Sequence, residues 1–286
     1  MVEYFMQFKV FRNENVVQGT SDVSFSSMKN HQRAIRFLKS LSYKNIKPKN
    51  LIWAEQIFGS RVRVCKKEDG GKKIKGVDGL ISNLPNQILS ILTADCLPIL
   101  MYDKKKKVVA ALHGGRECLI KGILEKAVEK MKKKFKSQSK DILVAIGPHI
   151  RVCHYWLRGK TYQKLKETNW KKYFLKKKGK VYPVPFTGRK NRNHIVSSEK
   201  RCGVYFNLTK LAVSQLLKSG IKKENIEDCK ICTYCHYKNF FSFRKSEEKP
   251  EIYPAHKKIM CGVYPEKNPR FASFIGLSKT KYISNT

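Results

Sequence analysis

Two side chains that can do chemistry together flank neighbouring apolar stretches of the sequence. Cys96 precedes the apolar run 97–102, and His113 follows the run 108–112. If both runs are β-strands, a cysteine at the edge of one strand and a histidine at the end of the next can meet in space. A thiolate and a neutral imidazole bind zinc or copper, and the same pair can serve as nucleophile and general base. The pair predicts a reactive site.

The residues after His113 suit an anion. Gly114 and Gly115 let the backbone approach a ligand closely, and the helix expected after them offers unpaired N–H groups beside Arg116. The alternative interpretation is structural: Cys96 as a small buried apolar residue and His113 as a satisfied strand-end residue.

The elements that must position these residues form an irregular series. Strands outnumber helices and interleave with them without strict βαβ alternation, which predicts an α+β fold: a mixed β-sheet sandwich with flanking helices in a single domain, residues 1–286. Helices are expected near 28–41, over 117–135, and from the N-cap Asn207 to Gly220. Strands are expected at 4–11, 51–56, 62–65, 79–82, 99–102, 108–113, 142–146, 230–233, 240–244 and 271–276, and the segment 158–201 as a surface excursion.

The composition narrows the class of protein. Hydrophobic residues make up 41% of the chain, enough for a sizeable core, and no uncharged apolar run reaches the about 18 residues that a membrane span needs. The first ten residues lack the pattern of a secretion signal. Nine cysteines, an odd number, indicate reduced thiols and not a disulfide framework. We therefore expect a cytoplasmic protein without a membrane anchor.

The charge of the chain raises the question of nucleic acid. The formal net charge is +38, but most of the 60 basic residues are lysines, whereas base and phosphate recognition favours the planar arginine fork. Lysine runs such as 104–107 and 176–178 are typical of solvated turns and helix faces. We expect weak attraction to polyanions at low salt and no specific nucleic-acid binding.

The segments 93–96 and 113–116 together resemble the laccase-domain family, also called the polyphenol-oxidase or peptidoglycan-editing-factor family, whose pattern is ADC, a strand, then HAGWRG. Similar segments follow the family's order along nearly the whole chain. They are Gln56-Ile57-Phe58-Gly59, Val77-Asp78-Gly79-Leu80, Ile146-Gly147-Pro148-His149-Ile150, Cys153-His154-Tyr155, Tyr205-Phe206-Asn207-Leu208, Cys232-Thr233, Phe240-Phe241-Ser242-Phe243-Arg244 and Pro269-Arg270-Phe271-Ala272.

The resemblance implies a purine-nucleoside enzyme with one metal, usually zinc and sometimes copper. The activities assigned to the family are phosphorolysis of adenosine, inosine or methylthioadenosine, deamination of adenosine, polyphenol oxidation and peptidoglycan editing. The implied partners are a purine nucleoside and phosphate, and the oligomeric state stays open. The implied catalytic residues are Cys96, His113 and Arg116, with Cys96 and His113 as metal ligands and Gln56, Asp78, Gly114, Gly115 and Arg244 as substrate-binding residues.

Some of these roles have plain alternatives. Asp78 precedes a glycine and can form an ordinary turn, and Arg244 can form a surface ion pair. Aligned without a gap on HAGWRG, Arg116 takes the place of the family tryptophan, and Glu117 that of the arginine.

The sequence departs from the family at a metal ligand. Phe58 stands where the family has a histidine, and a phenyl ring has no lone pair for a cation, whereas catalytic zinc normally takes three protein ligands. This favours a second hypothesis, a metal-free relative that binds a ligand or partner without turnover. The candidates for a replacement metal ligand are His149, His154, Asp78 and Cys118.

A second group of cysteines has the spacing of a metal site. Cys229, Cys232 and Cys235 are followed by His236. On a strand, successive side chains alternate between faces, so Cys232 would point away from the other two cysteines. Because a closed zinc site needs four converging ligands, we do not expect a metal there.

Overall fold

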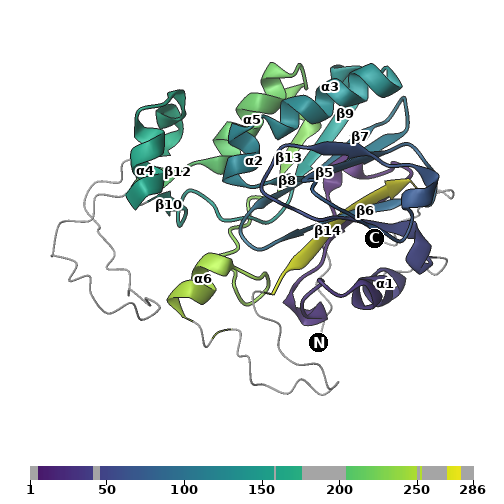
Figure 1. Cartoon of the computed structure of the whole chain (residues 1–286), viewed down its shortest axis with the longest axis horizontal. Coiled ribbons are helices and arrows are strands. Elements are labelled where there is room, and N and C mark those ends of the chain that lie inside the picture. Colours follow the sequence, from purple (N-terminus) through teal and green to yellow (C-terminus); the bar gives the residue numbers. More distant parts are fainter. Residues whose placement is uncertain are drawn as a thin grey trace.

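Two β-sheets packed face to face form the centre of the molecule, and helices cover both outer faces (Figure 1). The computed structural model describes residues 6–40, 46–157, 159–175, 204–249, 252 and 269–277. Buried residues between the sheets include Leu80, Leu100 and Ile275. This α+β sandwich confirms the predicted fold class.

The six-stranded sheet carries the chemistry of the chain. Its order is β13-β9-β7-β8-β5-β3, and the central pair β7 and β8 is antiparallel. Both strands are buried on both faces: Leu97, Ile99 and Met101 face the helices, whereas Leu100 and Tyr102 face the other sheet. The strand bounds are β3 (Val62–Val64), β5 (Gly79–Ser82), β7 (Leu97–Asp103), β8 (Val108–Gly114), β9 (Ile142–Ile146) and β13 (Ile226–Asp228).

The second sheet has five strands in the order β1-β14-β6-β2-β4, and a small third sheet has the order β10-β12-β11. The C-terminal strand β14 lies between β1 and β6 and is buried throughout. The bounds are β1 (Val16–Thr20), β2 (Leu51–Ala54), β4 (Lys73–Ile74), β6 (Ile88–Thr93), β10 (Trp156–Leu157), β11 (Phe174–Leu175), β12 (Val204–Phe206) and β14 (Phe271–Leu277).

Helices α2, α3 and α5 pack on the six-stranded sheet, and α1 covers the other side (Figure 1). The Asn207 side chain accepts a hydrogen bond from Lys210 N and begins α5 as expected, and Gly220 follows its end with φ +85°. The helix bounds are α1 (His31–Ser40), α2 (Arg116–Ile120), α3 (Ile123–Phe135), α4 (Gly159–Lys166), α5 (Leu208–Lys218) and α6 (Phe243–Glu248).

Several of the predicted helices and strands differ from those in the structure. The helix over 117–135 is broken at Gly122, whose φ of +74° a continuous helix cannot accommodate. Residues 230–233 and 240–244 are not strands, because turns occupy 233–239 and α6 starts at Phe243. The expected first strand holds a single bridge at Met6 and a 3₁₀ helix at Lys9–Phe11, and its first two residues lie outside the described residues. In the expected surface excursion 158–201, residues 159–175 include α4 and β11, whereas residues 158 and 176–201 lie outside the described residues.

Within the part of the chain that the structure describes, every helix is too short or too polar to span a lipid bilayer.

Candidate active site

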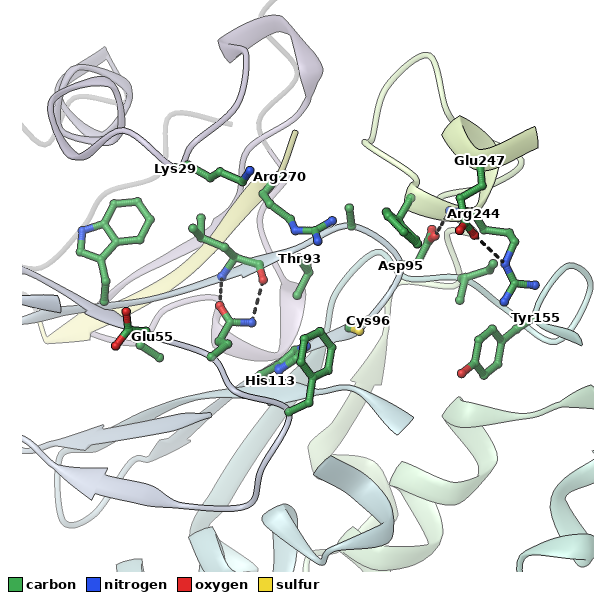
Figure 2. A pocket seen from close by; sticks show the side chains of 18 of the residues that line it. Lys29, Glu55, Thr93, Asp95, Cys96, His113, Tyr155, Arg244, Glu247 and Arg270 are labelled. Carbon is green, nitrogen blue, oxygen red and sulfur yellow. Dashed lines mark hydrogen bonds and ion pairs between the residues drawn. The ribbon is translucent and has the colours of Figure 1, made fainter. Parts of the chain in front are cut away.

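The register of β7 and β8 places Cys96 beside His113. Pro98 pairs with His113 and Leu97 with Gly114, so Cys96, one residue before β7, lies next to the end of β8. Both side chains contact the space beside Gly115 that a larger residue would fill. A Cβ atom added at Gly115 would lie 3.2 Å from His113 Nε2 and 3.3 Å from Cys96 Sγ. The two side chains face the same pocket (Figure 2). The expected meeting of the two residues is confirmed.

A buried carboxylate fixes the orientation of the histidine. His113 is 2% exposed, and its Nδ1 lies 2.8 Å from Oδ1 of the fully buried Asp78. Nδ1 therefore faces the core and leaves Nε2 toward the cavity. Burial opposes a charged ring, but negative charge on the Cys96 sulfur and the hydrogen bond to Asp78 outweigh it and hold the pKa of His113 well above its usual value. The raised pKa makes His113 a candidate proton donor.

Asp78 also shapes the loop on the other side of the histidine. Its carboxylate accepts hydrogen bonds from the backbone N–H groups of Ile57, Phe58 and Gly59 at 3.3, 3.0 and 2.7 Å. Phe58 has a φ of +58°, a left-handed conformation that is unfavourable for a phenylalanine. Burial raises the pKa of Asp78, but the His113 and backbone hydrogen bonds more than offset it, and the net pKa is lowered. Asp78 thus acts as a buried positioning residue.

Phe58 lies where a third ligand of the pair would lie. Its ring centroid is 5.0 Å from that of His113, in an edge-to-face arrangement, and the side chain is 51% exposed at the cavity wall. The cavity measures about 660 Å³, within the range of small-molecule sites. Aromatic side chains form much of its wall, among them Trp53, Tyr155 and Phe243.

Two arginines line the cavity near the Cys96–His113 pair. The Arg244 guanidinium donates to Trp156 O at 3.2 Å and lies 5.6 Å from the centre of the Tyr155 ring. It also forms the ion pair that was the alternative interpretation, with Glu247 at 4.0 Å (Figure 2). Arg270 has no hydrogen bond or ion pair through its guanidinium among the described residues, and Figure 2 shows that group above Thr93. Burial lowers the pKa of Arg270, while negative charge at Cys96 and Asp95 opposes the shift. The guanidinium lies 5.9 Å from the centre of the Phe243 ring, which leaves its N–H donors free to bind an anion.

Asp95 fastens Arg244 to this wall. Its buried carboxylate accepts hydrogen bonds from Arg244 N at 2.7 Å and Thr233 Oγ1 at 2.6 Å. Burial raises the pKa of Asp95 although these hydrogen bonds oppose the shift. Asp95, which precedes β7, therefore connects the start of that strand to Thr233 and to the first turn of α6.

Of the other residues expected at the site, Gln56 lines the cavity, whereas Gly114 and Arg116 do not. Gln56 lines the cavity, but its amide group is engaged by the backbone of Leu92 at 2.8 and 2.9 Å. Gly114 packs against β7, where a Cβ atom would approach Leu97 to 2.9 Å. Arg116 is turned to the Tyr155 hydroxyl at 3.1 Å and to Glu117 at 2.9 Å, and it is not among the cavity-lining residues.

Comparison with known proteins shows the family of the chain. A model of the family described as "Multi-copper polyphenol oxidoreductase laccase" matches residues 8–251. The chain belongs to this family. Its relatives in the laccase family include a purine nucleoside phosphorylase of Bacteroides thetaiotaomicron, which is 28% identical over 189 residues, or 66% of this chain and 63% of that protein. The matched region thus spans less than two thirds of this relative's length.

Other laccase-family relatives extend the comparison. Purine nucleoside phosphorylase YlmD of Bacillus subtilis is 25% identical over 205 residues, or 69% of this chain and 66% of that protein. The crystal structure of YfiH from Bacillus licheniformis superimposes with a TM-score of 0.71 at 21% identity, over 93% of this chain and 94% of that one. YlmD from Geobacillus stearothermophilus gives a TM-score of 0.70 at 20% identity, over 97% and 100%. These structures show the shared fold.

The cavity wall only partly fits the metal that the laccase family implies. Cys96 Sγ and His113 Nε2 are suitable donors, and Asp78 supplies the carboxylate that typically orients a ligating histidine. The third position is the phenyl ring of Phe58. Two donors do not complete a catalytic zinc site, which takes three, or a blue-copper site, which takes two histidines and a cysteine.

None of the expected replacements supplies the third donor to the cavity. Both ring nitrogens of His149 are engaged, by Gly147 O at 2.8 Å and Thr209 Oγ1 at 2.7 Å. His154 belongs to a separate cluster of cysteines. Asp78 and Cys118 lie behind His113 on its Nδ1 side; their donor atoms are within 4.8 Å of one another, but all three residues are buried and joined by hydrogen bonds.

Phe58→His is expected to restore a three-ligand site. Asp78 already holds the loop backbone, and histidine tolerates positive φ better than phenylalanine. We expect zinc affinity at this site to rise by at least about tenfold, measured by calorimetric titration. The background is Cys235→Ser, which removes one thiol from the separate cluster of Cys153, His154, Cys232 and Cys235. Phe58→Asn, which also tolerates positive φ but is a poor zinc ligand, is the control; equal zinc affinity in both variants would contradict the assignment.

Two of the pocket residues were given no role in the sequence-based prediction. Arg270 and Tyr155 both lie in segments that resemble the family pattern, which is the signal that could have identified them. Sequence separation concealed Arg270, because the pairing of β14 with β6 brings it beside Thr93, which is distant from it in the chain.

Proposed function

We propose that this protein cleaves purine nucleosides by phosphorolysis in the cavity at Cys96 and His113. The observation that carries the proposal is a half-buried arginine, Arg270, whose guanidinium makes no hydrogen bond or ion pair among the described residues, in the same cavity as a histidine whose pKa is raised. Phosphorolysis needs both an anion site for phosphate and a proton donor for the departing base. Relatives that are named purine nucleoside phosphorylases support the same reaction class.

The proposed reaction assigns a task to each group. Arg270 holds phosphate, and the aromatic wall of Phe58, Tyr155 and Phe243 receives the purine. A phosphate oxygen forms a bond to ribose C1′ while the C1′–N9 bond breaks and its electron pair moves into the purine. The imidazolium of His113 gives its proton to the purine from Nε2. The products are the free base and ribose 1-phosphate.

The wall of the cavity gives the purine rings a surface and the ribose a polar edge. Phe58 is half-exposed and edge-on to His113, so a base lying on the phenyl ring would lie beside the proton donor. Adenosine, inosine and methylthioadenosine share this purine and ribose core and are the substrates we propose. Deamination of adenosine at the same cavity is a further candidate, which the product analysis below distinguishes.

We also propose a reducing compartment, the cytoplasm, for this reaction. The cysteines in the part of the chain that the structure describes are all free. Thiols without disulfide partners are typical of proteins kept reduced.

The alternative is a relative that binds nucleoside without turning it over, and Phe58 is the observation that favours it. The experiment is to incubate the protein with inosine or adenosine at varied phosphate and to quantify free base and inosine by chromatography. Phosphate-dependent release of base supports phosphorolysis. Binding of nucleoside with no product in any condition supports the alternative.

Arg270→Ala tests the phosphate site. Removing a charged hydrogen-bond donor that binds an anion weakens binding by about 1.5–3 kcal/mol. We therefore expect KM for phosphate to rise about tenfold to a hundredfold, with a smaller change in KM for the nucleoside. Arg36→Ala removes an exposed arginine of α1 and is the matched control. An unchanged phosphate KM in Arg270→Ala would remove phosphate from this position.

A further inference from the structure

A second cluster of metal-ligand side chains lies outside the cavity. It consists of Cys153, His154, Cys232 and Cys235, whose donor atoms all lie within 4.8 Å of one another. The first two residues lie in the turn that follows β9, and the other two lie in the turn after β13. Two segments distant in sequence thus contribute a Cys-His pair and a Cys-x-x-Cys pair to one point.

The distances in the cluster match those of a tetrahedral zinc ion. Zinc bonds of about 2.3 Å to sulfur and about 2.0 Å to nitrogen place sulfurs about 3.8 Å apart and sulfur about 3.6 Å from nitrogen. Cys153 Sγ and Cys235 Sγ are 3.9 Å apart. The Nδ1 atom of His154 lies 3.2 Å from Cys153 Sγ, 3.3 Å from Cys235 Sγ and 4.0 Å from Cys232 Sγ.

The backbone around the cluster is arranged as in thiolate metal sites. Arg151 N donates to Cys232 Sγ at 3.5 Å, and the backbone of Cys235 also hydrogen-bonds to the Cys232 side chain. Such N–H donors stabilise a coordinating sulfur and orient it, as outer-shell partners of metal ligands do. The His154 ring stacks on Tyr234 with centroids 4.1 Å apart, which fixes the plane of the imidazole.

We propose that Cys153, His154, Cys232 and Cys235 form a structural zinc site of the Cys₃His type. Four converging protein ligands close the coordination shell and leave no position for a substrate, so the site is structural and not catalytic. Cys229 and His236, whose spacing in the sequence resembles a metal site together with Cys232 and Cys235, lie outside the four. The expectation that Cys232 and Cys235 diverge was wrong because turns, and not a strand, occupy 233–239.

The position of the site connects it to the cavity. His149 and Cys232 form a parallel bridge, and Thr233 N donates to His149 O at 3.0 Å. Tyr155, which follows His154, lines the cavity. Thr233, which follows Cys232, donates a hydrogen bond to the cavity-lining residue Asp95. A metal here would fasten together the two loops that carry one wall of the cavity.

The test is zinc content of the full chain, purified without chelator, loaded with zinc and washed. We expect Cys235→Ser, which changes an exposed residue, to hold about one zinc ion per chain less than the wild type. Cys229→Ser is the matched control in the same loop and should hold as much zinc as the wild type. Cys96→Ala separates this site from the cavity, because it should retain the zinc that Cys235→Ser loses.

A second measurement does not depend on the stability of a variant. In the wild-type protein, zinc should protect three thiols from alkylation, and cobalt substitution should give intense thiolate charge-transfer absorption that Cys96→Ala retains and Cys235→Ser loses. Equal zinc in wild type and Cys235→Ser, or a Cys153–Cys235 disulfide under these conditions, would overturn the proposal. Neither readout uses catalysis, so the result is separate from the fate of the proposed nucleoside reaction.

Discussion

His113→Asn is expected to lower kcat for phosphorolysis by about 10²–10⁴-fold, the usual contribution of a general acid. The asparagine amide can still hydrogen-bond to Asp78, so the loop that Asp78 holds should keep its conformation. What the variant loses is the proton at Nε2, the atom that contacts, together with Cys96, the space beside Gly115. The measurement is steady-state kinetics with inosine at saturating phosphate.

The matched control for this prediction is His236→Asn. His236 contacts Cys232 O at 3.1 Å and belongs neither to the cavity nor to the four cluster ligands. Its variant should keep full activity. A His113→Asn protein that is folded and as active as His236→Asn would show that the base departs without a proton from His113, and the assignment of His113 would be wrong.

Asp78→Ala should be the most destabilising single change near the site. It removes the acceptor of three backbone N–H groups and leaves His113 without its buried partner. Breaking a buried charge pair from one side costs about 3–5 kcal/mol, and we expect a loss of that size in the free energy of unfolding, measured by urea titration. Asp103→Ala is the control, since Asp103 is a buried carboxylate of the same sheet that only caps a turn; equal losses would contradict a special role for Asp78.

The contribution of the Asp78–His113 pair to the free energy of unfolding should decrease both at low pH and at high pH. The lowered pKa of Asp78 means that its stabilisation is present above its unfolded pKa of 3.8 and is lost as the pH falls through the folded value. The raised pKa of His113 means that its stabilisation is complete below its unfolded pKa of 6.5 and is lost as the pH rises through the folded value. The stability difference between wild type and Asp78→Asn should therefore be largest between about pH 4 and pH 6.5.

The sequence predicts the centre of the fold well and its edges poorly. Strands β5, β7, β8 and β9 are long enough and apolar enough to be recognised, and their antiparallel register brings Cys96 to His113. The short strands β10, β11 and β13 have two or three residues and carry no periodic pattern. Gly122 breaks the predicted long helix although the apolar spacing continues across it.

The predicted site shows the same division. Segment order located Cys96, His113 and Asp78, but sequence alone could not show that Arg116 turns to Tyr155 while Arg270 enters the cavity. The cysteine cluster was missed for a different reason. Its two halves are far apart in the chain, and the assumption of a strand placed Cys232 and Cys235 on opposite faces.

The identity of the sugar product tests the proposed function most directly. Inosine is incubated with the zinc-loaded wild-type protein in phosphate, and the products are followed by phosphorus NMR together with chromatography of the base. We predict ribose 1-phosphate and hypoxanthine in equal amounts, formed only when phosphate is present and formed at least about 10²-fold more slowly by His113→Asn. Release of hypoxanthine with free ribose, or no release of base under any phosphate concentration, would contradict phosphorolysis at this cavity.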